Sequence, residues 1–127
     1  MNQQSIIEDI FKEDGMLKKK NPFYKKRPSQ IEAAKHILKG LNEQKHVIFQ
    51  GPTGLGKSAA YTSGVMQYLV DNPRKRVLIV TSGLSLQEQL LHKDVPFMIS
   101  VFDELYPQKR IKDFFRYTVL KGMNNYI

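Results

Sequence analysis

The stretch Gly51-Pro52-Thr53-Gly54-Leu55-Gly56-Lys57-Ser58 matches the phosphate-binding loop pattern G-x-x-x-x-G-K-[ST] at every fixed position. The apolar run at residues 46–50 predicts a buried strand before it, and residues 59–70 predict a helix after it. A strand, a glycine-rich loop and a helix form the setting that this motif requires. The structural alternative is a glycine turn that happens to precede a lysine and a serine.

This loop predicts a site for ATP and Mg²⁺. Its glycines let backbone N–H groups turn toward an anion, and the start of the following helix adds a positive dipole end. We expect Lys57 to reach the β- and γ-phosphates and Ser58 to ligate Mg²⁺, which makes these two the candidate catalytic residues. The residues expected at the phosphates are Gly51, Thr53, Gly54, Gly56, Lys57, Ser58 and Ala59.

Length and charge narrow the class of protein. The 127 residues indicate one domain, and the net charge of +8 makes a polyanion, with nucleic acid first, the natural partner. A generally basic soluble protein is the alternative. No apolar run approaches the length of a membrane span, and the first residues lack the form of a signal peptide. We therefore expect a cytoplasmic protein with no membrane partner.

The rest of the chain predicts an α/β fold, a partial P-loop NTPase lobe with a short parallel sheet flanked by helices. A capping box at Ser5 and Glu8 starts a first helix that should end near Gly15. Further helices are predicted at residues 29–44, 84–92, 97–106 and 111–115. Further strands are predicted at residues 76–81 and 116–120.

A basic segment at residues 16–27 precedes the second helix. It holds Lys18, Lys19, Lys20, Lys25, Lys26 and Arg27. Pro22 excludes a continuous helix through the segment. We interpret it as a basic connector, either one that follows a phosphate backbone or a solvated linker.

Several motifs stand in the order used by superfamily-two helicases of the DinG and XPD type. Tyr24-Lys25-Lys26-Arg27-Pro28-Ser29-Gln30 resembles the Q-motif of these helicases, and the phosphate loop follows it. Val77-Leu78-Ile79-Val80-Thr81 resembles motif Ia. The resemblance continues in Leu86-Gln87-Glu88-Gln89-Leu90-Leu91, in Lys93-Asp94-Val95-Pro96, and in a tail at residues 120–126 similar to K-G-R-x-N-Y. It covers residues 24–127, a partial RecA-like ATP-binding domain, and leaves residues 1–23 as an N-terminal helix and basic connector.

The resemblance implies roles for individual residues. Gln30 would hydrogen-bond the adenine edge, Tyr24 would stack on the base or border it, and Arg27 would lie beside them. Thr81 and Gln87 would contact single-stranded DNA through its phosphates. The structural alternatives are a solvent-facing Gln30 in the first turn of a helix and an exposed Gln87 on the next helix.

The sequence also departs from the family pattern. It has no cysteine, so no iron–sulfur cluster is expected, and Met123 stands where the family has arginine. Neither the acidic D-E-A-H motif nor a second lobe with an arginine finger follows, so we expect ATP binding with negligible turnover. Residues 98–104 end in Asp103 and Glu104 like a Walker B strand, but Pro96 and the helical spacing of the apolar residues favour a helix.

Two function classes follow from these features. The first is the ATP-binding N-terminal portion of a DinG-like ATP-dependent DNA helicase, which alone neither hydrolyses ATP nor unwinds DNA. The second is a small non-catalytic nucleotide- or nucleic-acid-binding protein that regulates or competes with a helicase or nucleic-acid complex. Without the acidic strand, the strand at residues 47–49 would have a free edge, so we expect self-association, a partner chain or a local rearrangement to cover it.

Overall fold

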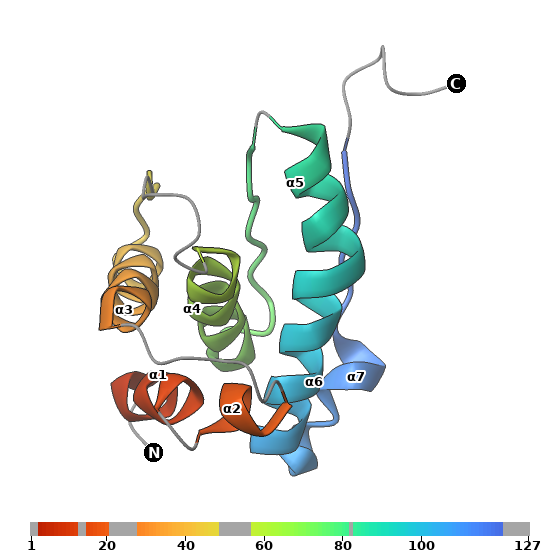
Figure 1. Ribbon diagram of the computed structural model, residues 1–127. Coiled ribbons are helices and arrows are strands. Elements are labelled where there is room, and N and C mark those ends of the chain that lie inside the picture. Colours follow the sequence, from red (N-terminus) through yellow and green to blue (C-terminus); the bar gives the residue numbers. More distant parts are fainter. Residues whose placement is uncertain (1–2, 13–14, 21–27, 49–56, 82, 121–127) are drawn as a thin grey trace. The chain divides into compact units, whose positions relative to one another are not determined.

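The computed structural model describes residues 3–12, 15–20, 28–48, 57–81 and 83–120 (Figure 1). Their secondary structure is helical. The helices are α1 (Gln3–Phe11), α2 (Met16–Lys20), α3 (Pro28–Asn42), α4 (Lys57–Asp71), α5 (Leu84–Gln89), the π-helix η1 (Leu90–Asp94), α6 (Val95–Leu105), the 3₁₀-helix η2 (Pro107–Lys109) and α7 (Ile111–Phe114). The chain divides into two compact units, unit 1 (Met1–Leu78) and unit 2 (Ile79–Ile127).

Unit 1 is built around the apolar faces of three helices. In α1 the buried residues are Ile6, Ile7, Ile10 and Phe11, which is the single helical face that the sequence predicted. Helix α1 packs against α3, and α3 packs against α4. Apolar side chains from α3 and α4 complete the buried set: Ala34, Ile37, Leu38, Ala60, Met66, Tyr68 and Val70.

A glycine allows α3 and α4 to approach closely. A Cβ atom added at Gly64 of α4 would lie 2.9 Å from the backbone oxygen of Ala34 and 3.2 Å from Cγ2 of Ile37, both on α3. A larger residue would therefore force the two backbones apart. Gly64 weakens α4 by about 1 kcal/mol relative to alanine, and the close packing of the two helices offsets this cost.

Unit 2 contains a nearly continuous helical run from α5 through η1 to α6. The hydrogen-bond register widens in η1, where the N–H of Val95 donates to the carbonyl of Leu90. Pro96 follows directly and has no N–H to donate to the carbonyl one turn earlier, which accounts for the widened turn at this point. Met98, Val101 and Phe102 of α6 are buried, as is Ile111 of α7.

The predicted helices are confirmed, with shifted ends. Helix α6 also shows whether residues 98–104 form a helix or a Walker B strand. Asp103 and Glu104 lie on α6, so the interpretation of residues 98–104 as an acidic strand is wrong and the helical one is correct. Residues 16–20 of the predicted connector form the short helix α2, whereas residues 21–27 lie outside the described part of the chain.

The predicted α/β fold with a short parallel sheet is wrong for the described residues. None of them is in a strand, and the described residues of the predicted strands, 46–48, 76–81 and 116–120, have irregular backbone. Residues 49 and 50 of the first predicted strand lie outside the described part. The side chains of Ile48, Leu78 and Val80 are 93%, 75% and 82% exposed. Parallel strands are stable when both faces are covered, and the exposure of these apolar side chains shows that this condition is not met.

No helix in the described residues is long and apolar enough to cross a membrane. This finding concerns the described helices alone.

The burial of Phe102 gives a test of the packing in unit 2. Phe102 is fully buried, so Phe102→Ala should lower the free energy of unfolding by about 3–5 kcal/mol through lost apolar contacts and a cavity. Phe114→Ala is the matched control, because Phe114 is 72% exposed and its removal should change stability by less than about 0.5 kcal/mol. Chemical denaturation followed by circular dichroism measures both, and equal losses would contradict the packing described here.

Candidate functional site

Helix α4 begins at the lysine of the phosphate-loop pattern. Its first residue is Lys57, and Ser58 and Ala59 follow in the first turn, both half-buried. The first N–H groups of a helix have no partner within it and carry its positive dipole end. Residues 49–56 lie outside the described part of the chain, and they include Gly51, Thr53, Gly54 and Gly56. The helix that the motif requires is therefore present, and it starts where the glycines end.

Two other hydroxyl groups near this end of α4 are bonded within the helix. Thr62 Oγ1 donates to the carbonyl of Ser58, and Ser63 Oγ donates to the carbonyl of Ala60 over 2.8 Å. Thr62 and Ser63 are buried, whereas Ser58 is half-buried and lies closest to the helix start. Of the three, Ser58 is thus the hydroxyl available for a Mg²⁺ ion, which prefers oxygen ligands.

Gln30 lies in the first turn of α3 and is 6% exposed. The alternative that it faces solvent is therefore wrong. A buried side-chain amide is normally hydrogen-bonded, and Gln30 does have an interaction partner. Tyr24 and Arg27 lie outside the described residues, and the adenine-binding role of all three residues stays a prediction.

Thr81 and Gln87 lie together in unit 2. Gln87 Nε2 donates to the carbonyl of Thr81 at 3.5 Å, and the N–H of Gly83 donates to Thr81 Oγ1 at 3.4 Å. Both predicted residues are half-buried, so Gln87 is not the exposed residue of the structural alternative. Its Oε1 atom is buried and has no hydrogen-bond partner in the described part of the chain. A buried acceptor without a partner is costly unless another group satisfies it.

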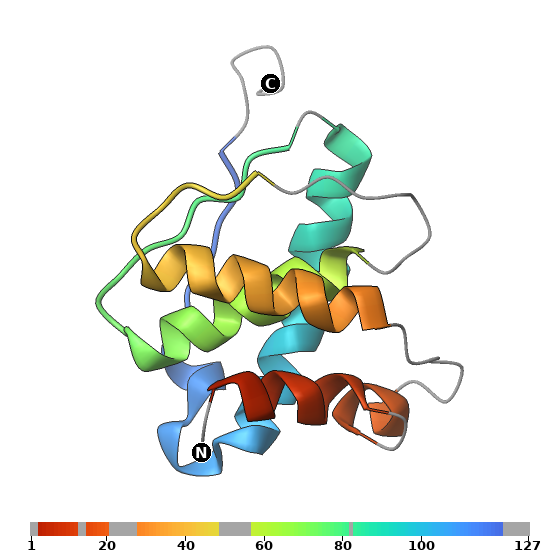
Figure 2. The same ribbon diagram turned by 90° about the vertical axis from the view of Figure 1, so that its left-hand side faces the viewer.

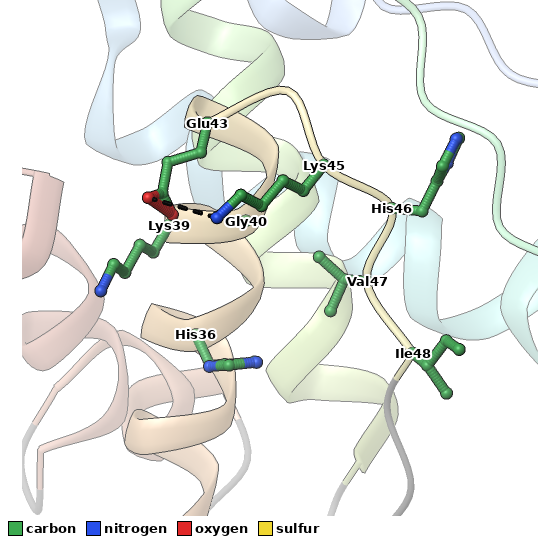
Figure 3. A pocket seen from close by; sticks show the side chains of 8 residues that line it. All are labelled: His36, Lys39, Gly40, Glu43, Lys45, His46, Val47 and Ile48. Atoms are coloured by element: carbon green, nitrogen blue, oxygen red, sulfur yellow. Dashed lines mark ion pairs between the residues drawn. The ribbon is translucent and has the colours of Figure 1, made fainter.

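The structure also contains a pocket that sequence reasoning missed. It has a volume of about 300 Å³ and lies between the C-terminal half of α3 and the segment that follows it (Figure 3). Its lining residues are His36, Lys39, Gly40, Glu43, Lys45, His46, Val47 and Ile48. Glu43 Oε1 is 3.8 Å from Lys45 Nζ, an ion pair at the edge of the pocket. No motif in the sequence pointed to it, because it depends on the path of the chain after α3.

The described residues contain no group of three or more His, Asp, Glu or Cys side chains that could hold a metal ion. A Mg²⁺ site at Ser58 needs phosphate oxygens and water as its other ligands, as is usual for this ion.

Comparison with known proteins places the chain in a family. Residues 23–120 match the family model described as "Type III restriction enzyme, res subunit". The chain is 37% identical over 91 residues to a Photobacterium profundum protein named "ATP-dependent DNA helicase DinG", which covers 70% of this chain and 12% of the relative. It is 29% identical over 119 residues to an Escherichia coli protein named "ATP-dependent DNA helicase YoaA", covering 94% of this chain and 16% of the relative.

A third relative carries a different name. A Staphylococcus epidermidis protein named "3'-5' exonuclease DinG" is 33% identical over 103 residues, which is 81% of this chain and 11% of the relative. The chain therefore spans less than a fifth of the length of these three relatives. No solved structure matches it. The family match covers most of the sequence, so the chain belongs to the family of the type III restriction enzyme res subunit and is, as its motifs predicted, a relative of the DinG helicases.

Proposed function

We propose that this chain is an ATP-binding part of a DinG-like DNA helicase. The observation that carries the proposal is the start of α4 at Lys57, directly after a complete glycine pattern. A helix of 15 residues starting there offers unpaired N–H groups and a positive dipole end to a nucleotide's phosphates. The family match over residues 23–120 and the names of the helicase relatives support the same assignment.

Each candidate residue has a defined task in this proposal. The glycines and the first turn of α4 bind the phosphates through backbone N–H groups, and the Lys57 ammonium neutralises their charge. Ser58 contributes one oxygen ligand to Mg²⁺, which when bound bridges phosphate oxygens and screens their charge. Gln30, at the start of α3, reads the adenine edge, with Tyr24 and Arg27 before it on the chain.

We infer that turnover by this chain alone is negligible. Hydrolysis needs an acidic group to hold Mg²⁺ and to orient the attacking water. The nearest sequence candidate, Asp103, lies on α6 and accepts a hydrogen bond from the N–H of Lys112 at 3.3 Å, with Lys112 Nζ 3.9 Å away. This carboxylate is thus engaged within unit 2. The alternative, a non-catalytic protein that regulates a helicase, would bind ATP in the same way without turnover. ATP turnover that is stimulated by DNA would favour the enzyme over this alternative.

We propose further that Thr81 and Gln87 contact single-stranded nucleic acid. The hydrogen bond from Gln87 Nε2 to the carbonyl of Thr81 supports this, because it holds the two side chains close together, and both carry groups that can donate to phosphate oxygens. Nucleic-acid binding also agrees with the net charge of +8.

The nucleotide site is tested by Lys57→Ala. Loss of one charge-assisted contact should weaken ATP binding by about 10- to 100-fold, measured by calorimetry with Mg²⁺ present. Lys93→Ala, which removes an exposed lysine of unit 2, is the matched control and should leave the affinity unchanged. ATP affinity unaffected by Lys57→Ala would reject the site.

The nucleic-acid contact is tested by Gln87→Leu, which keeps the length of the side chain and removes its polar atoms. We expect the affinity for a labelled single-stranded oligonucleotide to fall by about 2- to 10-fold, the effect of one hydrogen bond, with ATP affinity unchanged. Gln89→Leu is the control, because Gln89 is exposed and bonds to Asp94 within its own helical run. If both variants bind like the wild type, Gln87 does not contact nucleic acid.

A further inference from the structure

The positive charge of the chain is concentrated in unit 1. Residues 1–78 hold 14 of the 20 Lys and Arg residues and 7 of the 12 Asp and Glu residues, which places +7 of the net +8 there. Part of this charge lies beyond the C-terminal ends of α3 and α4, where neither the phosphate loop nor the predicted nucleic-acid contacts use it.

The two helices bring these cations to one end of unit 1. Helices α3 and α4 pack against each other and run in the same direction, so their C-terminal ends lie at the same side of the pair (Figure 2). Lys57 is at the other end of α4. We call the cations at the C-terminal side the basic end; its members are Lys39, Lys45, Arg74, Lys75 and Arg76.

Most of these charges are not neutralised by the protein. Among the described residues, Lys39 and the three cations from Arg74 to Arg76 form no ion pair, and all four are exposed. Within the same described part of the chain, Lys45 has only the long contact with Glu43. Exposed ion pairs are weak, so Lys45 also retains most of its attraction for an external anion.

The helix dipole explains only part of this arrangement. Cations stabilise a helix C-terminus within its last turn, and Lys39 satisfies that condition on α3. Arg74, Lys75 and Arg76 lie past the end of α4, beyond that short range. Their turn is held in place, because the N–H of Lys75 donates to the carbonyl of Asn72 at 3.0 Å and Asn72 Nδ2 donates to the carbonyl of Tyr68 at 2.8 Å.

The pocket at the end of α3 adds a recess to the charged surface. The imidazole of His36 faces the same space as the apolar side chains of Val47 and Ile48 (Figure 3). Its volume of about 300 Å³ is at the lower limit for small-molecule sites. A base can therefore rest against its apolar wall while the adjoining phosphates meet the cations at the edge.

From these observations we propose that the basic end is a second nucleic-acid contact surface, which binds the phosphate backbone of a single strand. The inference rests on the proposed function in that the chain binds nucleic acid. It adds a surface in unit 1, at the opposite end of α4 from the phosphate loop, to the contacts of Thr81 and Gln87 in unit 2. The recess for a base favours nucleic acid over an acidic protein as the partner.

The test compares two triple variants that remove the same charge. Arg74→Gln/Lys75→Gln/Arg76→Gln removes three cations of the basic end, and Lys93→Gln/Arg110→Gln/Arg116→Gln removes three exposed cations of unit 2. Binding of labelled oligodeoxythymidylate is measured by fluorescence anisotropy over a series of salt concentrations. Each lost phosphate contact reduces the slope of log K against log salt by about 0.7, so the first triple should reduce it by about 2 and the control by much less.

Three outcomes would overturn the proposal. Equal changes of slope in the two triples would show a response to net charge alone. If the wild-type chain binds ATP but not the oligonucleotide, the basic end is not a nucleic-acid surface, and the proposed nucleotide site is unaffected. In the third, poly-L-glutamate competes with the oligonucleotide for the wild-type chain but not for the first triple variant, while both chains bind the oligonucleotide equally. This result would assign the surface to acidic proteins. ATP affinity, measured for every variant, also reports that unit 1 is folded.

Discussion

The contact between α3 and α4 at Gly64 is the constraint on which unit 1 depends. Any side chain at this position would meet the backbone oxygen of Ala34, so a glycine is needed for the two helices to lie this close. The contact holds α4 against α3, and this also positions both ends of α4. The first turn of α4, with Ser58, and the turn that follows its last residue therefore have fixed places relative to α3.

Much of the helical structure could be predicted because its causes are local. The spacing of Ile6, Ile7, Ile10 and Phe11 is that of one helical face, and all four are buried. Pro96 near the start of a helix and the spacing of the apolar residues after it correctly favoured α6 over an acidic strand. The widened turn at η1 escaped prediction, because a proline within an apolar helical pattern indicates only that the hydrogen bonding changes nearby.

The sheet could not be predicted correctly from its β-branched residues, because strand propensity reflects packing against neighbours that the segment itself does not specify. Leu78 and Val80 lie in an apolar run, yet both are largely exposed. The pocket at the end of α3 escaped prediction for a related reason. Its wall combines one face of α3 with Val47 and Ile48, and their meeting depends on the path of the chain after the helix. In contrast, the helix after the glycine pattern was predicted, although it starts at Lys57 and not at Ala59.

In our proposals, the two ends of α4 attract a phosphate group in two different ways. At the N-terminal end the unpaired N–H groups and the dipole act in the same direction, so few formal charges are needed, and the sequence motif places one lysine there. At the C-terminal end the carbonyls and the dipole repel an anion. A phosphate can be bound at that end only by side-chain cations placed beyond the last turn, where the dipole has faded. This is the position of Arg74, Lys75 and Arg76. Their location past Asp71 therefore matters more for binding a phosphate than how many cations there are.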